Sequence, residues 1–439
     1  MKVFKFGGTS VGSVENMNAV MNLVTDGEQK IIVLSAMSGT TNALVEIANY
    51  LSNKNKEAAA TKIAALESTY AQVINKLLSG EYKKAAELAT REAFNTLRNH
   101  TAGEFNSTVG SREILAQGEL ISTALFSQLM LANGHSTKLI PALDFMRIDE
   151  EKSANAHIIS PLLKETISKA GQADYYITQG FICRNHLDEI DNLQRGGSDY
   201  TASLVGAAIE SEEVQIWTDI DGFHNNDPRF VEGTKKVEQL SFNEAAELAY
   251  FGAKILHPQT VLPAKLHNIP VRLKNTMNPS DSGTIITRES SGSGIKAVAA
   301  KDGIIAIKIR SYRMLMAYGF MRTIFEIFEK HKTPVDMVTT SEVAVSLTID
   351  NTANLNDIIE ELKHFAEVEV DYNMSIVCIV GDIISEENHF ASKVFTALEN
   401  IPVRMISYGG SRHNISVLVS TDNKKCTLQA ISDKVLNQD

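Results

Sequence analysis

The chain has few cysteines and no cysteine spacing that binds a metal. Its 439 residues include three cysteines, Cys183, Cys378 and Cys426. They lie far apart in the sequence and match neither a zinc site nor a redox motif. Scarce, unpatterned cysteine is typical of proteins from reducing compartments, where disulfides are rare. We therefore expect a cytoplasmic location and no metal held by the protein itself.

Positive charge and long apolar runs are also scarce. Lys and Arg number 42 against 53 Asp and Glu, so the net charge is −11 and the pI about 5.6. This acidic balance argues against a nucleic-acid partner. No apolar run approaches the ~18 residues of a membrane span, and the N-terminus lacks the apolar core of a signal peptide. We expect no membrane partner, and an anionic substrate would require a local cluster of cations.

Strand-like and helix-like segments alternate through the first two thirds of the chain. Residues 31–37 are β-branched and apolar, as in a buried strand, whereas residues 41–100 are rich in Ala, Leu, Lys and Glu and favour helices. A serine with a glutamate three residues later begins the segment 241–253, which is typical of a capped helix. The alternation predicts an α/β fold with a mostly parallel sheet between helices.

A repeat follows a Gly- and Ser-rich stretch, which is a candidate linker at 288–303. The pattern x-P-V-x-M occurs at Pro334 and again at Pro402, each time after an amphipathic helix and before two strands. This predicts two ferredoxin-like βαββαβ units. The second unit lacks an obvious last strand, so the two could interleave. We expect the segments 304–311 and 343–349 to form exposed sheet edges that favour a homodimer.

The N-terminal sequence VFKFGGTSVGS places a lysine within a strand and two glycines just after it. It has neither the P-loop spacing nor the dinucleotide G-x-G-x-x-G spacing. Lys5, Gly7, Gly8 and Ser10 could face a phosphate, or they could form an ordinary glycine turn. The residues alone leave both interpretations open.

A second glycine pair precedes an apolar helix in QRGGSDYTASLVGAAI. Arg195, Gly196 and Gly197 come just before Ser198 and Asp199. A helix N-terminus after glycines is a common anion site. Simple N-capping by Ser198 or Asp199 is the alternative, but capping requires neither two glycines nor an arginine.

Two further stretches carry charge after predicted elements. WTDIDGFHNNDPRF contains Asp219 and Arg229, and it is either a set of turns or a nucleotide-binding loop. Lys254 follows a glycine near a helix end, where a lysine usually complements the helix dipole. No Ser–His–Asp order or carboxylate pair stands out. Cations and glycine turns are what phosphoryl transfer needs, because it depends on positioning and charge neutralisation.

Together these motifs resemble those of the aspartate kinases, which combine an amino-acid-kinase fold with two C-terminal ACT domains. KFGGTSV, QGFI, RGGSDYTA, TDIDG…DPR and GAKILHP occur in the family's order, and VDMVTTSEVAVSLTID resembles its effector segment. The resemblance covers nearly the whole chain. It implies an amino-acid-kinase domain at 1–287, a linker at 288–303, and ACT domains at 304–371 and 372–439.

The resemblance also implies a reaction and its residues. ATP would phosphorylate the β-carboxylate of L-aspartate, with Mg²⁺ held mainly by the phosphates. The catalytic residues would be Lys5 and Asp199. Aspartate would be bound by Ser35, Thr41, Glu119, Phe181, Arg195 and Ser198. ATP would be bound by Lys5, Gly7, Gly8, Ser10, Thr218, Asp219, His224, Arg229 and Lys254. An end-product amino acid, lysine first, would be bound by Met314, Asp336, Val338, Ser341 and Glu342.

Two departures from the family pattern bear on binding. His224 stands where many members have tyrosine, which concerns adenosine packing. Met316 and Ala317 stand where lysine-sensitive members carry polar residues, so threonine, or no effector, stays open.

Other functions compete with this hypothesis. A glutamate, acetylglutamate or uridylate kinase would share the fold, and a non-catalytic amino-acid sensor would use the ACT pair alone. Lys5, Asp199 and Lys254 argue against the sensor. The chain length argues against a fused dehydrogenase.

Overall fold

The chain folds into two compact units. The computed structural model describes residues 1–193, 196–252, 256–289, 294–314, 318–383 and 390–436. Unit 1 comprises Met1–Gly222 and Ile255–Glu289, and unit 2 comprises Phe223–Lys254 and Ser290–Asp439. The segment 223–254 therefore belongs to unit 2, although it interrupts unit 1 in the sequence.

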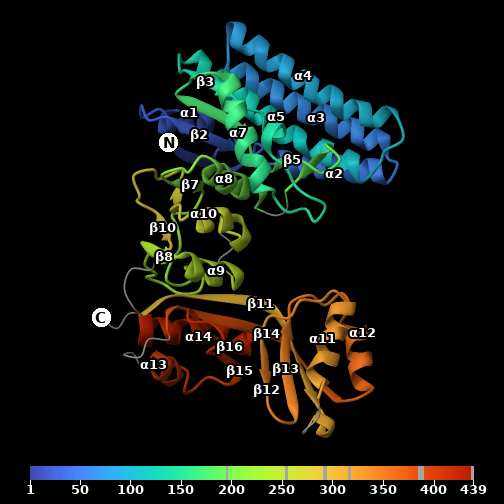
Figure 1. Ribbon diagram of the computed structural model, residues 1–439, viewed down its shortest axis with the longest axis vertical. Helices are drawn as coiled ribbons and strands as arrows, with labels where there is room; N and C mark the ends of the chain where they lie inside the picture. The colour runs from blue at the N-terminus through green and yellow to red at the C-terminus, as the bar shows by residue number, and fades with distance from the viewer. Residues whose placement is uncertain (194–195, 253–255, 290–293, 315–317, 384–389, 437–439) are drawn as a thin grey trace. The chain divides into compact units, whose positions relative to one another are not determined.

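Unit 1 is an α/β unit (Figure 1). Its strands are β1 (Lys2–Phe6), β2 (Lys30–Leu34), β3 (Thr137–Leu139), β4 (Tyr175–Gln179), β5 (Ile182–Arg184), β6 (Ile190–Asn192), β7 (Val214–Thr218), β9 (Val271–Asn275) and β10 (Thr284–Thr287). Its helices are α1 (Val14–Val24), α2 (Thr40–Ser52), α3 (Lys56–Leu77), α4 (Gly80–Ala102), α5 (Val109–Ala132), α6 (Ala142–Phe145), α7 (Ala156–Ala170), α8 (Gly197–Ala208) and α10 (Leu262–Leu266).

The main sheet of unit 1 brings the predicted loops to one edge. Its strands run in the order β3-β4-β2-β1-β7-β9-β10, and neighbouring strands are parallel except for β9 and β10. Both faces of β2 and β4 are buried, which explains their continuous apolar character. Because parallel strands end at the same edge, the loops after β1, β2, β4 and β7 meet there.

Helices α1 to α5 cover a large apolar core on the sheet. Among the described helices, α5 is long and apolar enough to cross a membrane by length and composition, but 72% of its apolar window is buried in unit 1. A core helix of a globular protein passes the same test. Because α5 is buried against the sheet, some of its residues lie beside the edge where the loops meet.

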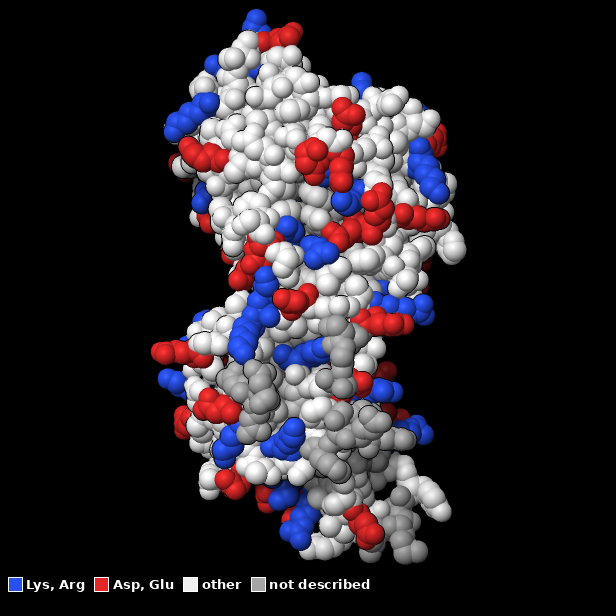
Figure 2. Space-filling model, turned by 90° about the vertical axis from the view of Figure 1, so that its left-hand side faces the viewer, with Lys and Arg blue, Asp and Glu red and all other residues white. Residues whose placement is uncertain are grey.

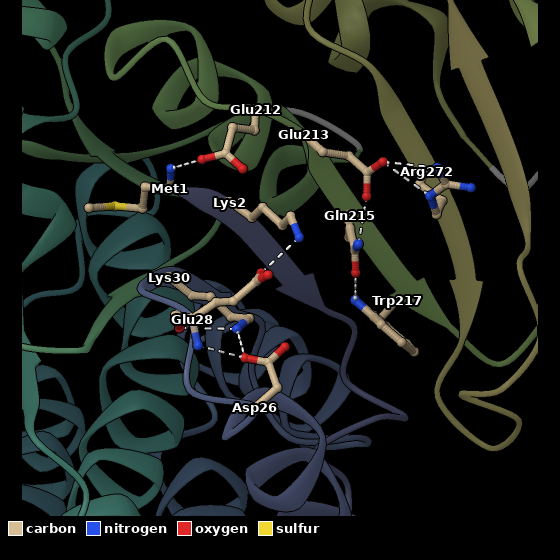
Figure 3. Close-up of polar contacts among 10 residues, drawn as sticks. All are labelled: Met1, Lys2, Asp26, Glu28, Lys30, Glu212, Glu213, Gln215, Trp217 and Arg272. Carbon is tan, nitrogen blue, oxygen red and sulfur yellow. Dashed lines mark hydrogen bonds and ion pairs between the residues drawn. The ribbon is translucent and has the colours of Figure 1, made fainter.

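The opposite edge of the sheet, at the amino ends of the strands, is held by charge pairs (Figure 3). Lys2 Nζ lies 2.7 Å from Glu28 Oε2, and the fully buried Lys30 pairs with Asp26. A hydrogen-bond chain runs from Trp217 to Gln215 (3.1 Å) and on to Glu213 (2.6 Å). Among these groups, the fully buried Lys30 depends most on its partner.

Unit 2 is built around one antiparallel sheet with the order β12-β13-β11-β14-β16-β15. The strands of this sheet are β11 (Gly294–Arg310), β12 (Val338–Thr340), β13 (Ala344–Ile349), β14 (Glu367–Asp382), β15 (Val403–Tyr408) and β16 (Asn414–Ser420), and unit 2 also contains the short strand β8 (Gln239–Ser241), which is not part of it. Its helices are α9 (Phe242–Tyr250), α11 (Phe320–Lys330), α12 (Leu355–Lys363), α13 (Phe390–Ala397) and α14 (Lys424–Ile431).

The long strand β11 serves both repeats. Its residues 304–310 pair with β13 and with the start of β14, whereas its residues 294–301 pair with the later part of β14. The first half of β11 thus occupies the place of the strand that the second repeat lacks. β11 also begins at Gly294, inside the stretch predicted as a linker, because only its first residues are Gly- and Ser-rich.

The predicted sheet edges are wrong. Residues 304–310 lie in β11 and residues 344–349 in β13, and both strands have neighbours on each side. The outer strands are β12 and β15, where the Thr339 hydroxyl donates to the Ile406 carbonyl at 3.4 Å. Strong β-propensity marks the central strands of this sheet rather than its edges.

Helix α9 begins as its sequence predicts. Ser241 is the N-cap, and its hydroxyl and the Glu244 carboxylate form a complete capping box. The predicted fold class, an α/β unit with a mostly parallel sheet followed by ferredoxin-like repeats, is confirmed.

The buried lysine at the amino edge predicts an asymmetric cost of substitution. Asp26→Ala leaves the buried Lys30 ammonium with the Glu28 carbonyl but without its carboxylate, and should lower the free energy of unfolding by about 2 kcal/mol. Lys30→Met should cost less, because the half-exposed Asp26 can be hydrated and methionine fills the space. Urea unfolding of both variants checks this, and equal or reversed costs would contradict it.

Candidate active site

A cavity opens where the loops of unit 1 meet. Its volume is about 230 Å³, which suits a small metabolite rather than a large ligand. The lining residues are Lys5, Ser35, Thr41, Glu119, Phe181, Gly196, Gly197, Ser198 and Asp199. The structure thus brings together both predicted catalytic residues and every described residue predicted to bind aspartate.

Lys5 and Asp199 face each other in this cavity. Both are about nine-tenths buried, and Lys5 Nζ lies 2.7 Å from Asp199 Oδ1. The contact is an ion pair, and Asp199 Oδ1 accepts no hydrogen bond from the described residues. Lys5 comes from β1, and Asp199 from the first turn of α8. The pair neutralises two charges that would be costly to bury singly.

The glycine loop after β1 is only partly available to a ligand. A Cβ on Gly8 would lie 2.8 Å from the Ala36 carbonyl oxygen, so the close approach of the two loops requires glycine. The Gly7 N–H, however, donates to the Trp217 carbonyl at 3.2 Å. The Ser10 hydroxyl is buried against the Thr276 hydroxyl at 2.7 Å. Of the phosphate contacts predicted here, the structure therefore leaves Lys5 and Gly8 the best placed.

The second glycine pair shapes the start of α8. Gly196 is the N-cap with φ = 76°, a left-handed conformation that favours glycine. A Cβ on Gly197 would lie 2.9 Å from side-chain carbons of Leu193 and Phe181. The Ser35 hydroxyl donates to the Ser198 hydroxyl at 3.0 Å, joining the loop after β2 to this helix. The glycines therefore permit close packing as well as an anion site.

Phe181 sits in a strained backbone conformation beside the cavity. Its φ is 69°, which is rare for a bulky residue. Its N–H donates to the Thr201 hydroxyl at 3.1 Å, and its carbonyl accepts from the Leu193 N–H at 2.7 Å. Strain held in place by such contacts is common at binding sites. Thr201 is a supporting residue that the sequence analysis missed, although it belongs to the RGGSDYTA motif.

Glu119 is the buried acid of the cavity. It lies on α5, is 4% exposed, and its Oε1 accepts from the Ala36 N–H at 3.2 Å. Burial raises the pKa of Glu119 to about 7, although hydrogen bonds from backbone N–H groups oppose the shift. A cationic group on the ligand would favour the charged form. Thr41, in the first turn of α2, lies exposed at the cavity.

The residues predicted to bind ATP are divided between the units. Thr218 and Asp219 belong to unit 1, where their side chains form a 3.0 Å hydrogen bond. His224 and Arg229 belong to unit 2. Arg229 makes a bidentate contact with Asp227, with its closest distance 2.6 Å, and this raises the pKa of Arg229. Two predicted residues, Arg195 and Lys254, lie outside the described residues.

The predicted effector residues lie in the first repeat of unit 2. Met314 ends a short 3₁₀ helix, Val338 begins β12, and Ser341 and Glu342 are exposed in the following turn. The Asp336 side chain is 2% exposed and already contacts Lys301. Met316 and Ala317 lie outside the described residues.

No group of three or more His, Cys, Asp or Glu side chains that could hold a metal occurs among the described residues. On the face shown in Figure 2, acidic and basic side chains are interspersed.

Comparisons with known proteins show first which domains the chain contains and then which enzyme family it belongs to. Residues 1–275 match the amino acid kinase family, and residues 377–435 match an ACT domain. The chain is 32% identical to the lysine-sensitive aspartokinase 3 of Escherichia coli, over 98% of both chains. The chain belongs to the aspartokinase family, as the motifs predicted.

Solved structures agree over the full length. The structure of E. coli aspartokinase III with aspartate and ADP superposes with a TM-score of 0.83 at 30% identity, covering 100% of both chains. The structure of the same enzyme with lysine and aspartate gives a TM-score of 0.82, again at 30% identity and 100% coverage of both chains.

The raised pKa of Glu119 predicts a pH-dependent affinity for an amino acid substrate. The ammonium group of such a substrate requires the ionised carboxylate, which is lost as the pH falls through about 7. The KM for the amino acid should therefore rise about tenfold from about pH 8 to about pH 6, while the KM for ATP changes little. Steady-state kinetics measure both constants.

Glu119→Gln is the matched control. It should raise the KM for the amino acid at every pH and remove the pH dependence, because the amide does not titrate. A flat profile in the wild type, or an unchanged slope in the variant, would contradict the role of Glu119.

Proposed function

We propose that this protein transfers the γ-phosphoryl group of ATP to the β-carboxylate of L-aspartate and forms 4-phospho-L-aspartate. This reaction is the first step of lysine, threonine and methionine biosynthesis. The observation that carries the proposal is the cavity, which joins Lys5, Asp199, Glu119 and Ser198 in a chain of the aspartokinase family. The E. coli enzyme solved with aspartate and ADP supports the same substrates here.

Two protein side chains of opposite charge bind the groups on the α-carbon of aspartate. Glu119 pairs with the ammonium group, and Arg195 binds the α-carboxylate in a bidentate way. Ser35, Thr41 and Ser198 donate hydrogen bonds, and Phe181 covers the aliphatic carbon. This arrangement leaves the β-carboxylate facing Lys5 and the glycine loop.

The transfer requires no general base. The β-carboxylate is already ionised at neutral pH, so one of its oxygens attacks the γ-phosphorus directly. The bond between that phosphorus and the β–γ bridging oxygen breaks, and ADP leaves with the electron pair. Lys5, preorganised by Asp199, stabilises the charge on the moving phosphoryl group. Gly8 lets the loop backbone approach it.

The remaining ATP contacts come from Thr218, Asp219, His224, Arg229 and Lys254, with Gly7 and Ser10 supporting the loop. In this structure Asp227 binds the Arg229 guanidinium. When ATP binds, the triphosphate replaces Asp227 as the partner of that guanidinium. The donor set fits a Mg²⁺ ion that is held mainly by phosphate oxygens, because the described residues offer no acidic cluster for it. When bound, Mg²⁺ neutralises phosphate charge.

The ACT repeats regulate this activity by binding an end-product amino acid, lysine first, at the segment containing Met314, Asp336, Val338, Ser341 and Glu342. The lysine complex of the E. coli relative supports this choice. The domain boundaries at 287, 303 and 371 and the cytoplasmic location belong to the same proposal. A sensor without catalysis is disfavoured by the Lys5–Asp199 pair.

A hydroxamate assay tests the reaction. Wild type with ATP and hydroxylamine should form hydroxamate with L-aspartate, but not with glutamate or acetylglutamate, since an acyl phosphate reacts with hydroxylamine. Lys5→Ala should lower kcat about 10²–10³-fold because one preorganised contact to the transition state is lost. Product with glutamate instead, or near wild-type kcat in Lys5→Ala, would refute the assignment.

We also propose a homodimer formed through unit 2. Phe325 on α11, and Ile406 and Tyr408 on β15, are each more than a third exposed, and pairing would cover them. Light scattering at micromolar concentration should give about twice the chain mass of 48.1 kDa. A mass of one chain would contradict the dimer.

A further inference from the structure

The segment 223–254 belongs to the kinase family match by sequence but to unit 2 in space. The match covers residues 1–275, whereas the compact unit that contains 223–254 is the one with the ACT repeats. This segment carries three of the proposed ATP residues, His224, Arg229 and Lys254. Its contacts with the rest of unit 2 therefore bear on nucleotide binding.

Near its beginning the segment is held at Phe230, the residue after Arg229. Lys424 Nζ, from α14, lies 4.0 Å from the centroid of the Phe230 ring and 2.6 Å from Asp302 Oδ2. Val231 is buried in the apolar core of the second repeat, and Phe230 packs against that core. Cation–π contact and core packing together fix this end on unit 2.

Near its end the segment is held at Tyr250, the last residue of α9. The Tyr250 hydroxyl donates to Asp336 Oδ1 at 2.6 Å, and Lys301 Nζ lies 3.1 Å from the same oxygen. Lys301 Nζ also lies 4.6 Å from the centroid of the Tyr250 ring and 2.9 Å from Asp350. Burial opposes the charge on Lys301, but its hydrogen bonds with Asp350 and Asp336 outweigh this and raise the pKa of Lys301.

Asp336 is almost inaccessible while this cluster is closed. Its side chain is 2% exposed, and its other oxygen, Oδ2, is buried with no hydrogen-bond partner among the described residues. An ammonium group of a ligand can therefore reach this carboxylate only by displacing Tyr250 or Lys301, or by opening the space beside Oδ2. Either change alters the contact that holds the end of α9.

Both anchors converge on the shared strand. Lys301 and Asp302 are consecutive residues of β11, at the point where its pairing with β14 shifts register. Lys301 serves the Tyr250 anchor, and Asp302 orients the lysine of the Phe230 anchor. α9 itself lies along β11 and β14 (Figure 1). The junction of the two repeats thus holds both ends of the segment.

We propose that Tyr250 is a positioning residue for ATP, which couples the carboxylate of Asp336 to the nucleotide-binding segment through its hydroxyl group. The proposal rests on the proposed ATP role of Lys254, which follows Tyr250 by four residues in the sequence. The hydroxyl group, not the ring, makes the hydrogen bond to Asp336. The ring packs edge-on against Phe251 with centroids 4.9 Å apart, and phenylalanine would preserve that contact.

Tyr250→Phe separates the hydroxyl from the ring. It should raise the KM for ATP about five- to tenfold, because part of the free energy of a hydrogen bond to a charged acceptor reaches the nucleotide. The KM for aspartate should change little, and the melting temperature should fall by only a few degrees, as expected for one lost hydrogen bond. Tyr372→Phe is the matched control, because Tyr372 lies on β14 of the same unit and is 56% exposed; it should leave both KM values unchanged.

A double-variant cycle tests the pathway through Asp336. Asp336→Ala should produce a similar rise in the KM for ATP, and Tyr250→Phe added to it should cause no further rise, because the same hydrogen bond is already absent. Calorimetric titration of ADP should show the same order of dissociation constants, and this readout does not require turnover.

Three results would overturn the proposal: an unchanged KM for ATP in Tyr250→Phe, an equal rise in both KM values, or additive effects in the double variant. Failure of the proposed function is distinguishable. In that case the wild type forms no aspartyl hydroxamate, whereas the ADP titrations still report whether Tyr250 and Asp336 are coupled.

Discussion

The ion pair between Lys5 and Asp199 is the contact on which the site depends. It joins the central strand of the unit 1 sheet to the first turn of α8, and it lies almost entirely out of water. A charge buried without a partner is costly, and each member of this pair supplies the partner of the other. In the proposed mechanism Asp199 holds the Lys5 side chain in place, so the cation needs little rearrangement during the reaction.

The pairing of cations with carboxylates also explains how an acidic protein binds two anions. The net charge of −11 would repel ATP and aspartate at a distance. In the proposed site the cations are local, and each described one is already paired with a carboxylate: Lys5 with Asp199, and Arg229 with Asp227. Binding then exchanges one anion for another, which costs less than desolvating a free cation. In the same proposal, Glu119 supplies the negative charge for the one cationic group of the substrate.

Much of the site could be predicted because its residues follow strands. Lys5, Ser35 and Phe181 belong to or follow β1, β2 and β4, and parallel strands bring their carboxyl ends together whatever the details of packing. The capping box of α9 and the two repeats were likewise local signals. By contrast, local patterns could not show that the Gly7 N–H is taken by Trp217, because that depends on the register of β1 with β7.

The prediction of the sheet edges in unit 2 was wrong because strand order depends on long-range pairing. Apolar, β-branched segments were expected at sheet edges, but β11 and β13 are central strands. Nor does the sequence reveal that residues 223–254 belong to unit 2, since the kinase family match at 1–275 runs through them. Tyr250 and Lys301 acquire a role only through that placement. Their contacts link residues far apart in the chain, which no local propensity encodes.

The most direct test of the proposed reaction traces an oxygen atom from the β-carboxylate of aspartate into phosphate. L-Aspartate labelled with ¹⁸O in its β-carboxylate is incubated with ATP, the protein and hydroxylamine, and the released phosphate is analysed by mass spectrometry. Attack of the carboxylate on phosphorus, followed by attack of hydroxylamine on the acyl carbon, leaves one ¹⁸O atom in each phosphate formed. Phosphate without ¹⁸O would mean that water, not aspartate, accepts the phosphoryl group, and would contradict the central claim.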